Sequence, residues 1–264
     1  MPIPDTKNLL SQMMSAFQFL RQTPDFIIRR KLWKGYMDTG WIAKLVVLGA
    51  IMFSYFFITG IIGLFTQPPQ AEVTEQGTSV MMSKLNMLGD KLILSGSMKY
   101  LVLILMETMI FHFAVKTYEY LSGIKRELTI KDFVHAEIRM IKVSIRSWFY
   151  ELIISIVVMA ILKLFGFKIL SNISFFLIQS YFIGVAFIDN YNEQSGIKIK
   201  ESFAIAYNHM GAAVLIGMVA YVLFLVPLIG IVITPFICAV ATTFYMYYAT
   251  TENPNIAFEH KLKS

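Results

Sequence analysis

Hydrophobic residues form one long stretch near the end of the chain, Gly211 to Thr250, which contains forty residues and no charged side chain. Pro227, Gly230 and Pro235 interrupt its middle, and a proline inside a helix removes a backbone hydrogen bond and clashes with the preceding turn. The pattern predicts two apolar limbs of roughly 15 residues, each about 22 Å long, which is shorter than the ~30 Å hydrocarbon core of a bilayer. A hairpin over residues 211–250 that enters a membrane and returns to the same side fits this pattern at least as well as one long span.

A second broken apolar stretch covers residues 148–188, where Gly166 in the sequence KLFGFK predicts a bend between two further limbs. Residues 41–65 and 100–115 are continuous apolar segments and predict two transmembrane helices. The expected fold is all-α: a polytopic integral membrane protein with two long transmembrane helices and two broken, hemi-penetrating helical hairpins. Nothing in the pattern divides residues 1–264 into more than one membrane domain.

Two segments have the spacing of amphipathic helices. Residues 8–20 place apolar side chains on one stripe, as in a helix that lies in the membrane interface: Leu9, Leu10, Met13, Met14, Phe17 and Leu20. Residues 116–147 contain a helix that we expect to be capped at Thr129, with Asp132 three residues later. Its apolar stripe consists of Val134, Ile138, Ile141, Ile145 and Trp148.

Lysine and arginine residues predict the orientation. Six precede the first apolar segment, three (Lys84, Lys91 and Lys99) lie between the first two, and seven lie from Lys116 to Arg146. Because basic residues are enriched on the cytoplasmic side, we expect residues 1–40 and 116–147, and both termini, to be cytoplasmic.

Composition supports a membrane protein: 56% of residues are hydrophobic, 15% are charged and the mean hydropathy is +0.62. Soluble domains have about 25% charged residues. The net charge of +6 therefore indicates anionic lipid rather than nucleic acid as the partner. The single cysteine, Cys238, forms no intrachain disulfide, and its apolar surroundings predict a packed thiol.

Motifs of enzymes are missing: there is no glycine-rich phosphate loop, HExxH, GxSxG or CxxC. His135-Ala136-Glu137 has the H-x-E shape of a zinc deaminase without the required cysteines. We expect no catalytic residue, no metal and no cofactor.

Glu107 lies in the middle of the apolar segment LVLILMETMIFHF. An ionisable residue at that depth is costly, so it should face protein or water. Two interpretations remain open: a functional acid, or a neutral or hydrogen-bonded acid that joins two helices. Gly184, Gly211 and Gly217 have the small size typical of close helix–helix contacts.

The order of segments in the C-terminal half resembles a known family. Its features are Phe187 to Asp189, Gly211 to Gly217, Val226-Pro227-Leu228-Ile229-Gly230, Pro235 and Ala241-Thr242, and upstream the sequence KTYEYLSG before a basic amphipathic helix. Over residues 100–250 the chain is similar to the CysZ-type sulfate permeases, whose domain also occurs in the etoposide-induced membrane protein.

The resemblance implies two transmembrane helices with two hemi-penetrating hairpins, sulfate uptake, and assembly of homo-oligomers in the bacterial inner membrane. It also implies an anion site at a Pro-Gly-Leu-Arg-Arg turn, where backbone N–H groups and guanidinium groups meet the anion. The matching stretch here begins at Pro24 and places Arg29 and Arg30 at the arginine positions, while Asp25 replaces the glycine.

Three hypotheses follow for function. The first is a transporter or channel for a small anion such as sulfate. The second is a membrane scaffold or assembly factor that keeps the same architecture, favoured by the altered anion turn. An intramembrane enzyme is a distant third, because no nucleophile–base pair or metal-ligand set is present.

Overall fold

The computed structural model describes residues 8–34, 36, 98–224, 226 and 229–250, and within them the fold is all-helical without strands, which confirms the expected fold class. The segment 41–65 and Pro227 lie outside the described residues. The elements are α1 (Leu9–Arg30), α4 (Met98–Ser122), α5 (Ile130–Leu164), α6 (Lys168–Gln194), α7 (Ile199–Asn208), α8 (Met210–Phe224), α9 (Ile229–Thr234), the π-helical segment η2 (Pro235–Ala239) and α10 (Val240–Thr250).

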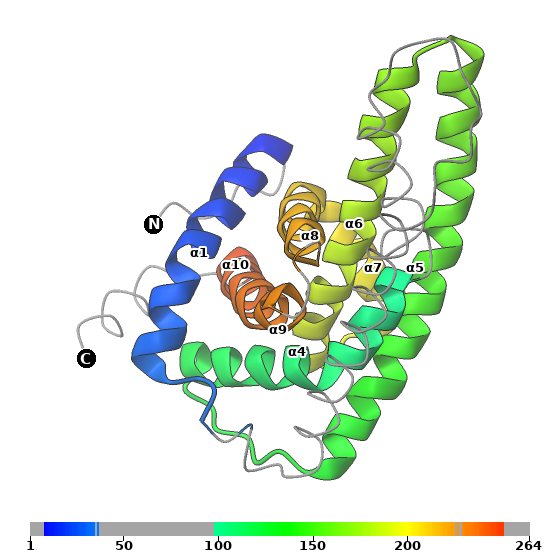
Figure 1. The fold of residues 1–264 in the computed structure, drawn as a ribbon. Helices are drawn as coiled ribbons and strands as arrows, with labels where there is room; N and C mark the ends of the chain where they lie inside the picture. Colours follow the sequence, from blue (N-terminus) through cyan, green and yellow to red (C-terminus); the bar gives the residue numbers. More distant parts are fainter. Residues whose placement is uncertain (1–7, 35, 37–97, 225, 227–228, 251–264) are drawn as a thin grey trace, which may run out of the picture.

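The helices surround a central group formed by α8, α9 and α10 (Figure 1). Helix α1 covers one side of this group, the α5–α6 hairpin covers the other, and α4 runs beneath it. Among the described residues, α4, α5, α6 and the run Gly230–Thr250 are each long and apolar enough to cross a membrane. The chain is therefore a multi-pass membrane protein.

Helix α5 is one unbroken helix of 35 residues, about 52 Å long. It begins where Thr129 donates its backbone N–H to the Asp132 carboxylate at 2.8 Å, which confirms the predicted cap. The predicted amphipathic helix and the first limb of the hairpin are thus continuous. Its apolar stripe points outward, with Val134 and Ile145 half or more exposed, as expected of a surface that contacts lipid.

Gly166 forms the turn between α5 and α6 and has a φ of +74°, a left-handed conformation that glycine adopts without strain. Leu164, Phe165 and Phe167 are exposed around it. This tip of the hairpin, which also carries the exposed Lys163, extends beyond the other helices in Figure 1.

The second hairpin turns between α8 and α9. Gly230 lies in α9, where an added Cβ would overlap the Leu223 carbonyl oxygen, so the glycine lets the two limbs approach closely. The break expected at Pro235 is absent, because the helical path continues from Gly230 to Thr250. The wider π turn that begins at Pro235 accommodates the proline, and the Thr234 hydroxyl donates to the Gly230 carbonyl at 2.6 Å in the preceding turn.

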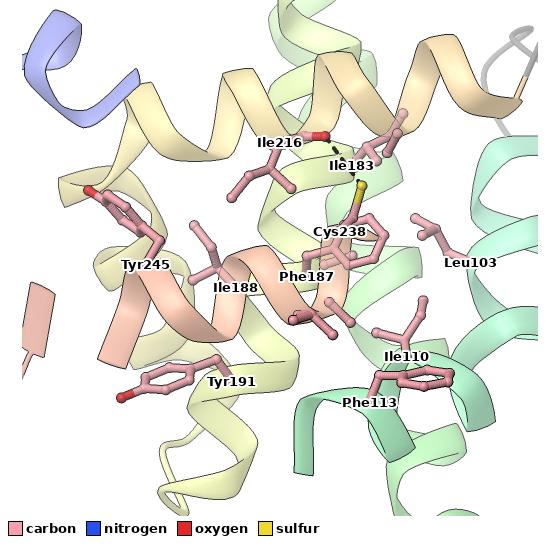
Figure 2. Packing of buried hydrophobic residues seen from close by; sticks show 14 of the residues in the cluster. Leu103, Ile110, Phe113, Ile183, Phe187, Ile188, Tyr191, Ile216, Cys238 and Tyr245 are labelled. Atoms are coloured by element: carbon pink, nitrogen blue, oxygen red, sulfur yellow. Dashed lines mark hydrogen bonds between the residues drawn. The ribbon is translucent and has the colours of Figure 1, made fainter. Parts of the chain in front are cut away.

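The core lies where α4, α6, α8 and α10 meet. Figure 2 shows Ile183 and Phe187 of α6 packed beside Cys238, with Leu103 of α4 nearby. The Cys238 thiol is fully buried and lies 3.9 Å from the Ile216 carbonyl oxygen, which confirms the predicted packed thiol.

Two glycines bring the backbones of α6 and α8 into contact. A Cβ on Gly184 would overlap the backbone of Ala213, and a Cβ on Gly217 would overlap the carbonyl oxygen of Ser180. The contact is reciprocal, since each helix supplies one glycine and one carbonyl. The predicted close packing at these glycines is confirmed.

Helix α1 docks on the 96° bend between α7 and α8. The buried Gln12 amide donates to the Asn208 carbonyl at 2.8 Å and accepts from the Gly211 N–H at 2.7 Å. The opposite face of α1 is apolar and exposed, including Leu10, Met14 and Phe17. This is the arrangement expected of a helix that rests on a membrane surface.

We expect Gly184→Ala and Gly217→Ala each to destabilise the protein by about 1–3 kcal/mol, because the added methyl group forces α6 and α8 apart. Thermal unfolding of the purified protein in detergent would measure the loss. Leu177→Ala, on the exposed face of α6, is the control and should unfold close to the wild-type temperature. Wild-type stability of Gly217→Ala would contradict the proposed crossing.

Candidate functional site

Buried ionisable side chains gather between α4, α5 and α6, and Glu107 is the deepest of them. Its side chain is fully buried, and both carboxylate oxygens accept from the Asn190 amide nitrogen at 2.9 and 3.0 Å. The predicted orientation toward protein is therefore observed. The contact joins α4 to α6, and the Asn190 amide oxygen has no partner among the described residues.

Arg139 of α5 forms the centre of the same site. Its guanidinium group donates to both carboxylate oxygens of Asp189 at 2.8 and 2.9 Å, the two-pronged geometry that makes such pairs strong. Glu193 lies 3.9 Å from the Arg139 Nε atom, and its other oxygen lies 3.3 Å from the His135 ring. These groups tie α5 to α6 beside Asn190, the residue that donates to Glu107.

The exposure of these side chains falls steadily from the surface inward. The His135 side chain is 77% exposed, those of Glu193 and Arg139 are 11% exposed, and that of Asp189 is 2% exposed. Glu107 is completely buried. We call this set, with Asn190, the acidic ladder, since it leads from the molecular surface to the interior.

The acidic ladder has more carboxylates than cations. Glu107, Asp189 and Glu193, with the partly buried Glu137, face one guanidinium group, that of Arg139. Like charges in a low-dielectric interior repel one another strongly. This composition suits a proton or a cation, and it repels an anion.

A second group of buried charges lies between α4 and α5. The Lys99 ammonium contacts a Glu151 oxygen at 2.5 Å, and the Tyr100 hydroxyl donates to the other oxygen at 2.6 Å. The Lys99 and Glu151 side chains are 0% and 5% exposed. Sequence reasoning missed this group, because Lys99 was expected in the connection between two membrane segments. The available signal was Glu151 itself, an isolated acid in an apolar run.

Helices α4 and α5 run side by side in opposite directions. Lys99 near the start of α4 contacts Glu151, and Phe111 farther along packs edge to face on Phe133, with ring centres 5.4 Å apart. The segments predicted as a transmembrane helix and as a cytoplasmic helix therefore occupy the same level of the molecule.

Arg29 and Arg30 lie in the last turn of α1, far along the helix from its N-terminus. The Arg29 side chain is 75% exposed and forms an ion pair with Asp25 at 2.7 Å. Arg30 donates to the Tyr120 hydroxyl at 2.6 Å, with its guanidinium group over the ring. Basic groups are favoured at this position by the negative end of the helix dipole. Their anion-binding role stays a prediction.

Comparison with known protein families identifies a match over most of the chain. A family model described as sulfate transporter CysZ/etoposide-induced protein 2.4 matches residues 8–235. The match confirms the resemblance over residues 100–235 and extends it toward the N-terminus. Searches among curated proteins and among solved structures found no match.

We expect Arg139→Met to destabilise the protein by about 3–5 kcal/mol, because it leaves Asp189 buried without its cation. The double variant Arg139→Met/Asp189→Leu should recover part of the loss, since an apolar pair replaces the ion pair while Glu193 still lacks its cation. Unfolding in detergent monitored by circular dichroism would measure both. Lys142→Met, an exposed lysine on the same helix, is the control. A double variant no more stable than the single one would argue against the assigned pairing.

Proposed function

The chain belongs to the sulfate transporter CysZ/etoposide-induced protein 2.4 family, and we propose on that basis that it carries a small anion such as sulfate across the bacterial cytoplasmic membrane. The observation that carries the proposal is the family match over residues 8–235, which includes the helices that hold both groups of buried charges. The proposal places both termini in the cytoplasm and includes homo-oligomers. It involves no enzymatic step.

Ionisable side chains within the membrane-spanning helices support a transport role. Such residues are expensive in a bilayer and commonly mark ion pathways. Here they occupy two separate levels between the same helices, with Glu107 in one and Lys99 in the other. A protein that served only as a membrane anchor would need neither group of buried charges.

Arg29 and Arg30 are the groups that we propose to attract the anion. Arg29 is exposed and needs only to exchange the carboxylate of Asp25 for a dianion. Arg30 lies beside it at the C-terminal end of α1, where Tyr120 orients its guanidinium group. Guanidinium groups match the geometry of tetrahedral oxyanions.

The alternative is a membrane scaffold or assembly factor that does not transport. One observation favours it: Asp25 replaces the glycine of the family's anion turn and already neutralises Arg29. A scaffold would keep the helix contacts and the lipid-facing surfaces, and it would not require an anion to reach the buried charges.

Purified protein in proteoliposomes should take up radiolabelled sulfate, and Arg29→Ala and Arg30→Ala should each lower uptake at low sulfate about tenfold or more. The reason is that a hydrogen bond to a charged group contributes about 1.5–3 kcal/mol. Arg146→Ala, an exposed arginine on α5, is the matched control and should leave uptake unchanged.

Absence of uptake by the wild-type protein would favour the scaffold. Uptake that is unaffected by both arginine substitutions would remove the assigned anion site while leaving transport in place.

A further inference from the structure

Lys99, Tyr100 and Glu151 form a compact arrangement of two donors around one carboxylate. Lys99 and Tyr100 are adjacent residues of α4, and each donates to a different oxygen of Glu151, at 2.5 and 2.6 Å. All three side chains are buried. Both donors come from α4, so they bind the two oxygens of the Glu151 carboxylate from the same side.

A purely structural role explains this arrangement poorly. Removing two charges from water costs several kcal/mol per ion, and apolar residues of similar volume commonly stabilise a helix contact as well or better. The neighbouring core residues, such as Leu103 and Met106 on α4, are apolar and fully buried. Apolar side chains at these positions would therefore have been enough to hold α4 against α5.

Serine hydroxyls line the same face of α5 on either side of Glu151. Ser147 lies one turn before it and Ser155 one turn after it, and both are more than nine-tenths buried. Their hydroxyl groups, with that of Ser144, have no hydrogen-bond partner among the described residues. Buried hydroxyls are normally satisfied, so these groups are available to a carboxylate that moves along the helix face.

We propose that Lys99 and Tyr100 form an internal binding station for a sulfate-like oxyanion, and that the Glu151 carboxylate occupies this station in competition with the anion. This inference rests on the proposed function and deepens it. When the oxyanion binds, its oxygens accept from the Lys99 ammonium and the Tyr100 hydroxyl. The Glu151 side chain then rotates along α5 toward Ser147 or toward Ser155, one turn away on either side, and the hydroxyl it reaches donates to it.

The station and the acidic ladder differ in the sign of the charge that each presents to a bound ion. The ladder has an excess of carboxylates, whereas the station has one cation, one hydroxyl donor and one acid that can move away. With Glu151 displaced, the Lys99 ammonium and the Tyr100 hydroxyl both face the bound anion as donors. An anion is therefore favoured at the station and disfavoured at the ladder.

Binding of radiolabelled inorganic sulfate to the full-length protein in detergent tests the station directly. Glu151→Gln keeps the shape of the side chain and removes the competing charge, so sulfate should bind at least tenfold more tightly than to wild type. Tyr100→Phe should weaken binding about tenfold, since it removes one hydrogen bond to a charged group. The double variant Lys99→Met/Glu151→Met should fold and lose binding.

Lys116→Met is the matched control, because Lys116 is another lysine of α4 in an ion pair, with Glu119, at the surface of the helix. It should bind sulfate as the wild type does. If the double variant fails to fold, Glu151→Gln and Tyr100→Phe decide the question.

Uptake measured in parallel separates the two proposals. Wild-type uptake together with unchanged sulfate affinity in Glu151→Gln and Tyr100→Phe would overturn the station and leave transport standing. Tight binding by Glu151→Gln without uptake by any variant would support the station and overturn transport. No binding by wild type or Glu151→Gln would overturn the station whatever the uptake.

Discussion

The contact between α6 and α8 determines where the other helices lie. In a bilayer, lipid tails are as apolar as the side chains, so helices associate through close packing rather than through the hydrophobic effect. At this crossing Gly184 and Gly217 remove the side chains altogether and bring each backbone against a carbonyl of the other helix. One half of α6 is thereby fixed against the second hairpin, and the half that carries Asp189 and Asn190 is presented to α4 and α5.

Helix α5 turns an apolar face outward and polar side chains inward, the reverse of a helix in a soluble protein. This arrangement produces the two groups of buried charges, the acidic ladder and the Lys99–Glu151 contact. Its apolar stripe faces outward, while Ser144, Ser147 and Glu151 face inward toward α4 and α6. Water-excluding surroundings strengthen every interaction between these groups and raise the cost of leaving any of them unpaired. The polar side chains of this interior therefore join α5 to α4 and to α6.

Local patterns in the sequence predicted the features that depend on a few neighbouring residues. The cap at Thr129, the bend at Gly166 and the close contacts at Gly184 and Gly217 all follow from side-chain size or spacing. The pairing of Lys99 with Glu151 could not be predicted in this way, because the two residues are 52 positions apart and meet only after α4 lies along α5.

At Pro235 the local pattern predicted a helix break that the structure does not have. Its local signal is strong, yet a π turn and the hydrogen bond from Thr234 accommodate it within a continuous helix. Glu107 was predicted in part. Its burial follows from its position in the middle of an apolar segment, whereas the identity of its partner, Asn190 on another helix, could not be predicted from the sequence.

The contact of Gln12 with the bend between α7 and α8 has a consequence for biosynthesis. Its two hydrogen bonds join positions 196 and 199 residues apart. At a synthesis rate of about 5–20 residues per second, helix α1 emerges from the ribosome about 10–40 s before its docking site exists. During that interval Ala16, Phe19 and Leu20, which are buried in the folded chain, lack the helices that will cover them. The opposite face of α1, with Leu10, Met14 and Phe17, stays exposed after folding and is suited to hold the helix at the membrane surface until its docking site has been synthesised.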